Sequence, residues 1–128
     1  MLRLSLLSLI SASSFALAAD DPQTAARLAS FTKDIKPILD KNCISCHGKD
    51  SKKTPKGRFN ATTLDGVVKG GKEEGKGVTW GDADKSSLYH LSLLGATAPN
   101  EDKAMPPKKH DPLTTEQLAT IKTWIEAK

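Results

Sequence analysis

Residues 43 to 47 read Cys43-Ile44-Ser45-Cys46-His47, and this C-x-x-C-H stretch decides how the rest of the chain is interpreted. Two cysteines about one helical turn apart can each form a thioether with the same edge of a porphyrin. The next residue, a histidine, can then present its imidazole to the iron. Because C-x-x-C-H is the attachment motif of c-type haem, the stretch predicts one covalently bound haem c whose iron alternates between Fe2+ and Fe3+.

Three other kinds of site use paired cysteines. A structural disulfide between Cys43 and Cys46 is compatible with an oxidising compartment. A redox-active dithiol of the thioredoxin kind lies beside a βαβ pattern, which this sequence lacks. A zinc site needs further ligands at suitable spacing, and the sequence has no third cysteine. The adjacent histidine and the N-terminal segment favour haem over all three.

The first 18 residues have the layout of a secretory signal peptide. Arg3 supplies a positive start, residues 4–17 are apolar apart from serines, and Ala16-Leu17-Ala18 fits a cleavage site. An uncleaved membrane anchor is the alternative, but this run is shorter than the roughly 20 residues that span a bilayer. We therefore expect export to the periplasm, cleavage near Ala18, and no integral membrane segment afterwards.

The rest of the chain is long enough for one small domain, but it is poor in large apolar side chains. A domain of this size buries only about 60–70% of the surface of its unfolded chain, so an apolar cofactor would supply the missing core. We expect a lead-in segment over residues 19–29 and a single domain over residues 30–128, acting as a monomer. The formal net charge of +4 is too small to indicate nucleic-acid binding.

Local patterns predict a few helices and no convincing strand. Thr114 and Gln117 form a capping box, with Leu113 and Leu118 at the positions of a hydrophobic staple. The helix after this box has Leu118, Ile121 and Ile125 on one face. Two further helices are expected before the loop at residue 48: one from Pro22, after Asp21 as N-cap, to Leu28, and one from about Asp34 to the Cys43 region with Pro37 in its first turn. Two more are expected after it: one from Thr63 to Lys69, stopped by Gly70-Gly71, and one from Asp84, as N-cap, to Leu94, with Gly95 ending it.

Long loops join these helices, notably over residues 48–61 and 96–112. Loops of this length are unusual in a compact domain unless something organises them. The sequence therefore predicts an all-α fold of a few helices and long loops wrapped around one haem.

Met105, which stands before Pro106-Pro107, is the candidate for the second axial ligand of the iron. A residue before proline is driven to extended geometry, and the two prolines stiffen the backbone after it. The alternative is that this methionine fills a gap in the core. His90 and His110 are the other candidate ligands; the first lies on a predicted helix away from its apolar face, and the second lies in a charged stretch. Ligation by histidine and methionine raises the reduction potential of the haem relative to more electron-donating ligands.

Lysines flank both halves of the candidate site, which predicts redox partners with an acidic docking surface. Rates of association are then expected to fall steeply with salt. Ordinary solvated lysines are the alternative. The lysines are Lys41, Lys49, Lys52, Lys53 and Lys56 around the attachment motif, and Lys103, Lys108 and Lys109 around Met105.

On the basis of the attachment motif, Met105-Pro106-Pro107 and the helix patterns, the chain resembles a mono-haem class I c-type cytochrome, most closely the small planctomycete-type cytochrome c domain. The resemblance covers about residues 30–126. The matching pieces are Phe31, Asp34-Ile35-Lys36-Pro37-Ile38-Leu39, Cys43-x-x-Cys46-His47-Gly48, Gly70-Gly71, Gly81-Asp82, Ser86-Ser87-Leu88, Met105-Pro106-Pro107, and Leu113-Thr114 through Trp124-Ile125.

The resemblance implies the cytochrome c fold, with the first and last helices crossing beside the haem. It implies thioethers at Cys43 and Cys46, His47 as proximal ligand and Met105 as distal ligand. Residues 78–83 depart from the family pattern, since prolines are expected beside Gly-Asp. In this stretch Trp80 has two interpretations: its indole N–H donates to a haem propionate, or its ring packs against the loop.

The function expected from the sequence is transfer of single electrons between periplasmic partners, without catalysis. One alternative is a gas- or peroxide-reactive haem protein with a displaceable sixth ligand. Another is a haem subunit that works only when docked in a larger oxidoreductase.

Overall fold

The structure of the protein is a computed structural model that describes residues 22–48 and 55–127. These residues are largely helical and form no strand, which confirms the predicted all-α class. The elements are α1 (Pro22–Ser30), the π-helical turn η1 (Phe31–Ile35), α2 (Lys36–Asn42), α3 (Ile44–His47), the 3-10 turn η2 (Lys56–Arg58), α4 (Leu64–Lys69), α5 (Ser87–Thr97) and α6 (Thr115–Glu126).

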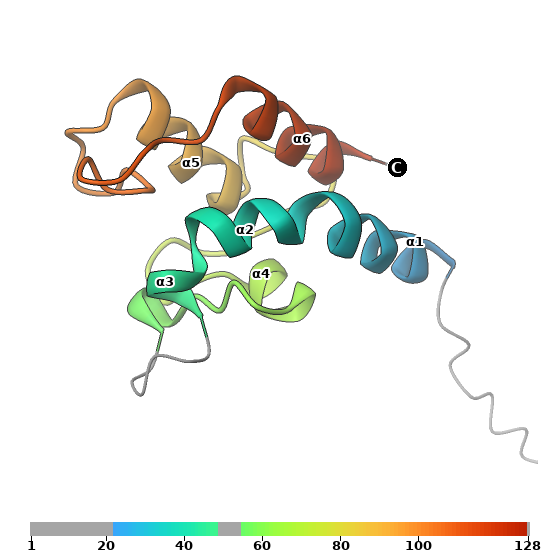
Figure 1. The fold of residues 1–128 in the computed structure, drawn as a ribbon. Helices are drawn as coiled ribbons and strands as arrows, with labels where there is room; N and C mark the ends of the chain where they lie inside the picture. Colours follow the sequence, from blue (N-terminus) through green and yellow to red (C-terminus); the bar gives the residue numbers. More distant parts are fainter. Residues whose placement is uncertain (1–21, 49–54, 128) are drawn as a thin grey trace, which may run out of the picture.

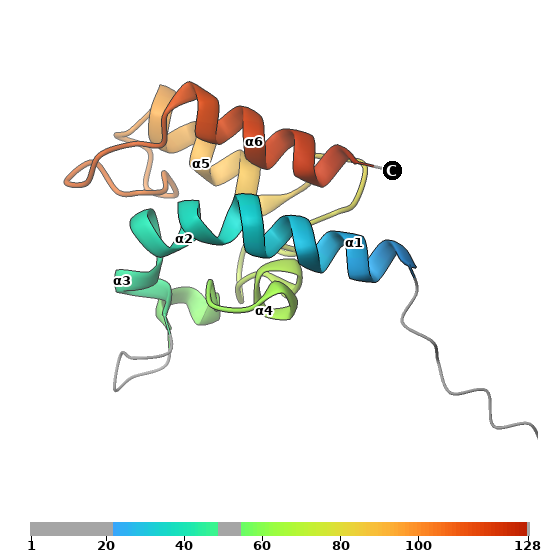
Figure 2. The same cartoon turned by 45° about the vertical axis from the view of Figure 1, so that its right-hand side comes forward.

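The helices are arranged around one long helical rod formed by α1, η1 and α2 (Figure 1). In both views α5 and α6 lie on one side of this rod, and α3 and α4 lie on the other (Figure 2). Helix α6 packs against η1 and against α5. Among the residues that the structure describes, no helix is both long enough and apolar enough to cross a bilayer.

The rod differs from the two separate helices that the sequence predicts. The chain continues as helix through η1, where the Lys36 N–H donates to the Phe31 carbonyl. Proline lacks an N–H, and in a regular helix its ring clashes with the carbonyl four residues earlier. The wider turn just before Pro37 accommodates that ring without ending the helix. The predicted N-cap, Asp21, lies outside the described residues.

The start signal of α6 is confirmed. The Thr114 hydroxyl accepts from the Gln117 N–H at 3.2 Å, and the Gln117 side chain accepts from the Thr114 N–H at 3.0 Å. Leu113 and Leu118 are both buried, as the staple requires. The predicted face of α6 is buried as well, with Ile121 and Ile125 completely inaccessible. Helix α4 also begins and ends as expected, capped by Thr63 and stopped at Gly70.

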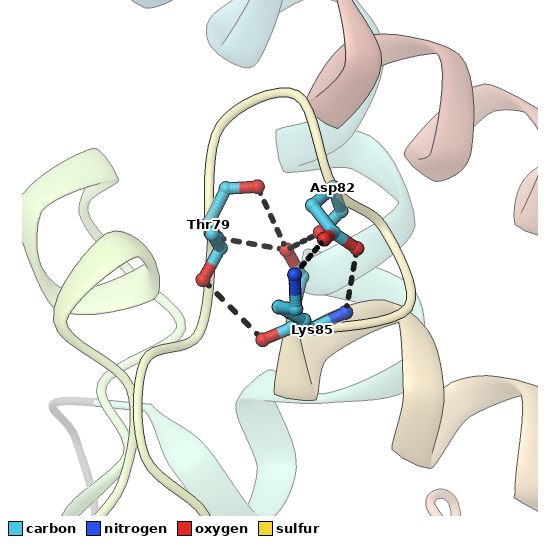
Figure 3. A network of polar contacts seen from close by, with 4 residues as sticks. Thr79, Asp82 and Lys85 are labelled. Carbon is cyan, nitrogen blue, oxygen red and sulfur yellow. Dashed lines mark hydrogen bonds and ion pairs between the residues drawn. The ribbon is translucent and has the colours of Figure 1, made fainter.

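Both predicted ends of α5 are wrong. The N-cap is Ser86 rather than Asp84, because the loop before the helix is held by its own hydrogen bonds (Figure 3). The buried Ser86 hydroxyl accepts from the Thr79 N–H at 2.8 Å and donates to the Asp82 carbonyl at 2.8 Å. The Asp82 carboxylate accepts from the Lys85 N–H and pairs with its ammonium group. At the other end, α5 runs through Gly95 to Thr97.

Candidate functional site

A cavity of about 540 Å³ lies between α3, α5 and three loop segments, which contribute residues from 56–59, 71–74 and 102–110. Its volume is within the range of about 300–1,000 Å³ that is usual for ligand and cofactor sites. Cys43, Cys46, His47 and Met105 all line it, although Met105 is far from the other three in sequence. Apolar side chains complete much of the wall, among them Phe59, Leu88, Leu91 and Pro106. The fold therefore brings the four predicted site residues to one cavity.

The two cysteines are held one turn apart by the junction of α2 and α3. The Cys43 N–H donates to the Leu39 carbonyl at 2.8 Å, and the His47 N–H donates to the Cys43 carbonyl at 2.9 Å. Both thiols are free and half-buried. Burial, with a smaller contribution from the neighbouring Cys46, raises the pKa of Cys43 to about 11. The structure thus presents two separate thiols to the cavity rather than a disulfide.

The imidazole of His47 is oriented by the main chain of η2. Its Nδ1 lies 2.8 Å from the Lys56 carbonyl oxygen. Because a carbonyl can only accept, Nδ1 carries the proton and Nε2 keeps its lone pair for a metal. Burial lowers the pKa of His47 below its ordinary value, which favours the neutral, ligating form. Phe59 packs edge-on against the ring, with centroids 5.2 Å apart.

The loop residues around Met105, residues 102–107, are called the Met105 segment, and this segment packs against α5. The Met105 N–H donates to the Leu91 carbonyl at 3.0 Å. At Gly95 the helix backbone approaches so closely that a Cβ atom there would overlap the Met105 carbonyl oxygen. Gly95 therefore does not end the helix, contrary to the expectation from the sequence; it makes room for the methionine segment.

Replacing Gly95 with alanine is expected to destabilise the protein, although alanine is favoured over glycine inside a helix by about 1 kcal/mol. The overlap is with main-chain atoms, which cannot rotate away, and overpacking of this kind typically costs about 1–3 kcal/mol. Thermal unfolding followed by circular dichroism measures the effect. His90→Ala, on the exposed side of the same helix, is the control and should not lower the midpoint. A raised midpoint in Gly95→Ala would contradict the close approach.

The two alternative histidines differ in their access to the cavity. His110 lines it, together with Met105. His90 is exposed and does not line it, since the cavity side of α5 carries Leu88, Leu91 and Ser92. Of the two, only His110 shares the cavity with the methionine.

Among the described residues, the charges around the cavity are more balanced than the lysine pattern of the sequence predicts. In this part of the chain four lysines line the cavity, namely Lys56, Lys72, Lys103 and Lys109, and so do three acidic residues, Glu73, Glu74 and Asp102. Lys103 is paired with Glu74, with 2.9 Å between Nζ and Oε1. Lys41 and Lys108 are not among the lining residues, while Lys49, Lys52 and Lys53 lie outside the described residues.

The structure favours the packing interpretation of Trp80. Its ring lies edge-on to Trp124, with centroids 4.9 Å apart, and the Arg27 guanidinium lies 4.1 Å from its ring centroid. Trp80 is not among the residues that line the cavity.

Two main-chain features of the site could not be predicted, or were predicted wrongly, from the sequence. His47 is oriented by the main-chain carbonyl of Lys56, and nothing in the residue types around position 56 indicates that contact. The sequence did contain a signal at Gly95, because a glycine in an apolar helical stretch marks either an end or a close approach.

Across residues 22–48 and 55–127, no group of three or more His, Cys, Asp or Glu side chains is arranged to hold a metal ion.

Comparison with known proteins identifies the family of the chain. A family model described as planctomycete cytochrome C matches residues 43–109, just over half of the 128 residues. Neither the curated proteins nor the solved structures gave a match. The matched segment begins at the first cysteine of the attachment motif and extends past Met105, so it contains all four candidate site residues that line the cavity. The chain therefore belongs to the planctomycete cytochrome c family.

Proposed function

We propose that this protein is a periplasmic mono-haem cytochrome c that carries single electrons between redox partners. Cys43 and Cys46 would hold the haem through thioethers, and His47 and Met105 would be the axial ligands. The observation that carries the proposal is that these four side chains all line the same cavity. Membership of a cytochrome c family indicates covalent haem c and electron transfer rather than catalysis. When bound, the haem supplies the one-electron Fe2+/Fe3+ couple.

The residues of the chain would position and shield the cofactor. The Lys56 carbonyl keeps the Nε2 atom of His47 free to ligate. The Leu91 carbonyl and Gly95 hold the Met105 backbone against α5. A ligand set fixed from both sides need not rearrange when the electron arrives or leaves, which suits a carrier. Apolar side chains such as Phe59 and Leu88 line the same cavity and would limit the access of water.

The wider organisation belongs to the same proposal. We infer a signal peptide over residues 1–18, a lead-in over 19–29 and a monomeric cytochrome domain with the cytochrome c fold over 30–128. Helix α1 buries none of its residues, which supports a lead-in outside the core. The contact between Phe31 and Trp124, with ring centroids 5.9 Å apart, supports the expected packing of the first and last helices.

Electron exchange with small redox complexes of opposite charge tests the carrier role and the proposed acidic partner together. Because lysines and acidic residues both line the cavity, we expect only a moderate preference for the anionic complex. The rate of exchange with the anionic complex should fall as salt rises, since the Debye screening length shortens from about 10 Å at 0.1 M to about 3 Å at 1 M. The rate with the cationic complex should rise.

Stopped-flow absorbance of the haem measures both rates on the holoprotein. Exchange that is immeasurably slow with both complexes would contradict the carrier role. Equal rates that stay flat with salt would mean that the lysines serve solubility rather than docking.

A further inference from the structure

We propose that the ion pair between Glu74 and Lys103 is a latch that holds the Met105 segment closed over the cavity. The pair would thereby set how readily the sixth coordination position opens. This inference rests on the proposed ligation of the iron by Met105. Glu74 and Lys103 are positioning residues in it, because they act through the methionine segment and not on the iron.

Three polar contacts link the segment of one proposed ligand to that of the other. The first joins His47 Nδ1 to the Lys56 carbonyl at 2.8 Å. The second runs from the Lys72 N–H to the Gly57 carbonyl, also at 2.8 Å. The third is the contact of 2.9 Å between Glu74 Oε1 and Lys103 Nζ. Residues of all three connected loops line the cavity, so the contacts form a continuous belt within its wall.

The ion pair is the link in this belt that joins two side chains. The other two links end on main-chain carbonyls, and the Met105 segment is attached to α5 through the Leu91 carbonyl. Lys103, two residues before Met105, attaches the same segment to the 71–74 loop. Losing the pair would therefore remove this attachment while the attachment to α5 remains.

The exposure of the pair limits its strength. The side chains of Lys103 and Glu74 are 65% and 30% exposed, and exposed ion pairs are individually weak and are screened by salt. The latch should therefore bias the opening of the methionine segment without preventing it.

Binding of imidazole to the ferric holoprotein measures this opening, because imidazole can bind only after the thioether has left. We expect Glu74→Gln and Lys103→Met each to speed binding by roughly two- to fivefold. The double variant should be no faster than either single variant. Exchanging the charges, with Glu74→Lys and Lys103→Glu together, should restore a slow rate. Raising the salt to 1 M should speed the wild-type protein but not the double variant.

A second ion pair in the chain provides a matched control. Lys36 and Asp40 pair on α2 at 2.6 Å, with side chains 37% and 42% exposed, and neither lines the cavity. Lys36→Met and Asp40→Asn should leave imidazole binding unchanged.

Failure of the latch can be distinguished from failure of the proposed function. If Met105→Ala binds imidazole much faster than the wild type but the Glu74 and Lys103 variants match the control pair, the latch is wrong and the ligand assignment stands. Additive effects in the double variant would also overturn the latch. His110 also lines the cavity, so the deciding comparison is Met105→Ala, His110→Ala against His110→Ala alone. If the double variant is no faster, Met105 is not the ligand, and the ligand assignment and the latch both fail.

Discussion

Replacing Cys43 and Cys46 together with alanine is expected to abolish covalent attachment of the haem. Both thiols line the cavity and are free, and thioethers at these sulfurs are the proposed bonds to the porphyrin. Wild-type protein produced with cytochrome c maturation machinery should keep its red colour through extraction with acidic organic solvent. Any haem associated with the double variant should pass wholly into the solvent.

The change should also affect folding, because long loops without a cofactor have little to organise them. We expect the double variant to lose the cooperative thermal transition seen by circular dichroism. Ser45→Ala is the matched control, since Ser45 lies between the cysteines and lines the same cavity; it should keep both the colour and the transition. Complete extraction of haem from the wild-type protein would rule out covalent attachment.

Replacing Met105 with alanine is expected to lower the reduction potential and to open the sixth coordination position. A thioether ligand raises the potential of a histidine-ligated haem, and alanine offers no donor in its place. A tenfold change in the relative stability of the two oxidation states corresponds to about 59 mV, and we expect a fall of at least that size. Protein-film voltammetry measures it.

Carbon monoxide provides the second measurement on the same variant. The reduced wild-type protein should show almost no spectral change with the gas, whereas Met105→Ala should bind it rapidly and stoichiometrically. His110 also lines the cavity, so Met105→Ala, His110→Ala is included to prevent the histidine from replacing the thioether. An unchanged spectrum and potential in Met105→Ala would reject the ligand assignment. Rapid binding by the intact wild-type protein would favour the gas-reactive alternative.

The features predicted correctly from the sequence depend on residues close together in the chain. The C-x-x-C-H motif spans five residues, and the family match over residues 43–109 confirms the resemblance drawn from it and from the pieces as far as Met105-Pro106-Pro107. The capping box at Thr114 and the stop at Gly70 were also correct. In each case the interacting groups are only a few positions apart, so the local pattern contains most of the information.

The features that required the tertiary structure depend on segments that meet only after folding. Gly95 was expected to end a helix, yet the helix continues through it. The glycine is needed there because the Met105 main chain occupies the space that a side chain at position 95 would fill. The Lys56 carbonyl that orients His47 belongs to a turn after the attachment motif, and the Glu74–Lys103 pair joins two separate loops. Sequence alone therefore determined the class of cofactor and the local helix signals. The folded chain decided which main-chain groups and charges surround the site, because those contacts form between residues that no local pattern links.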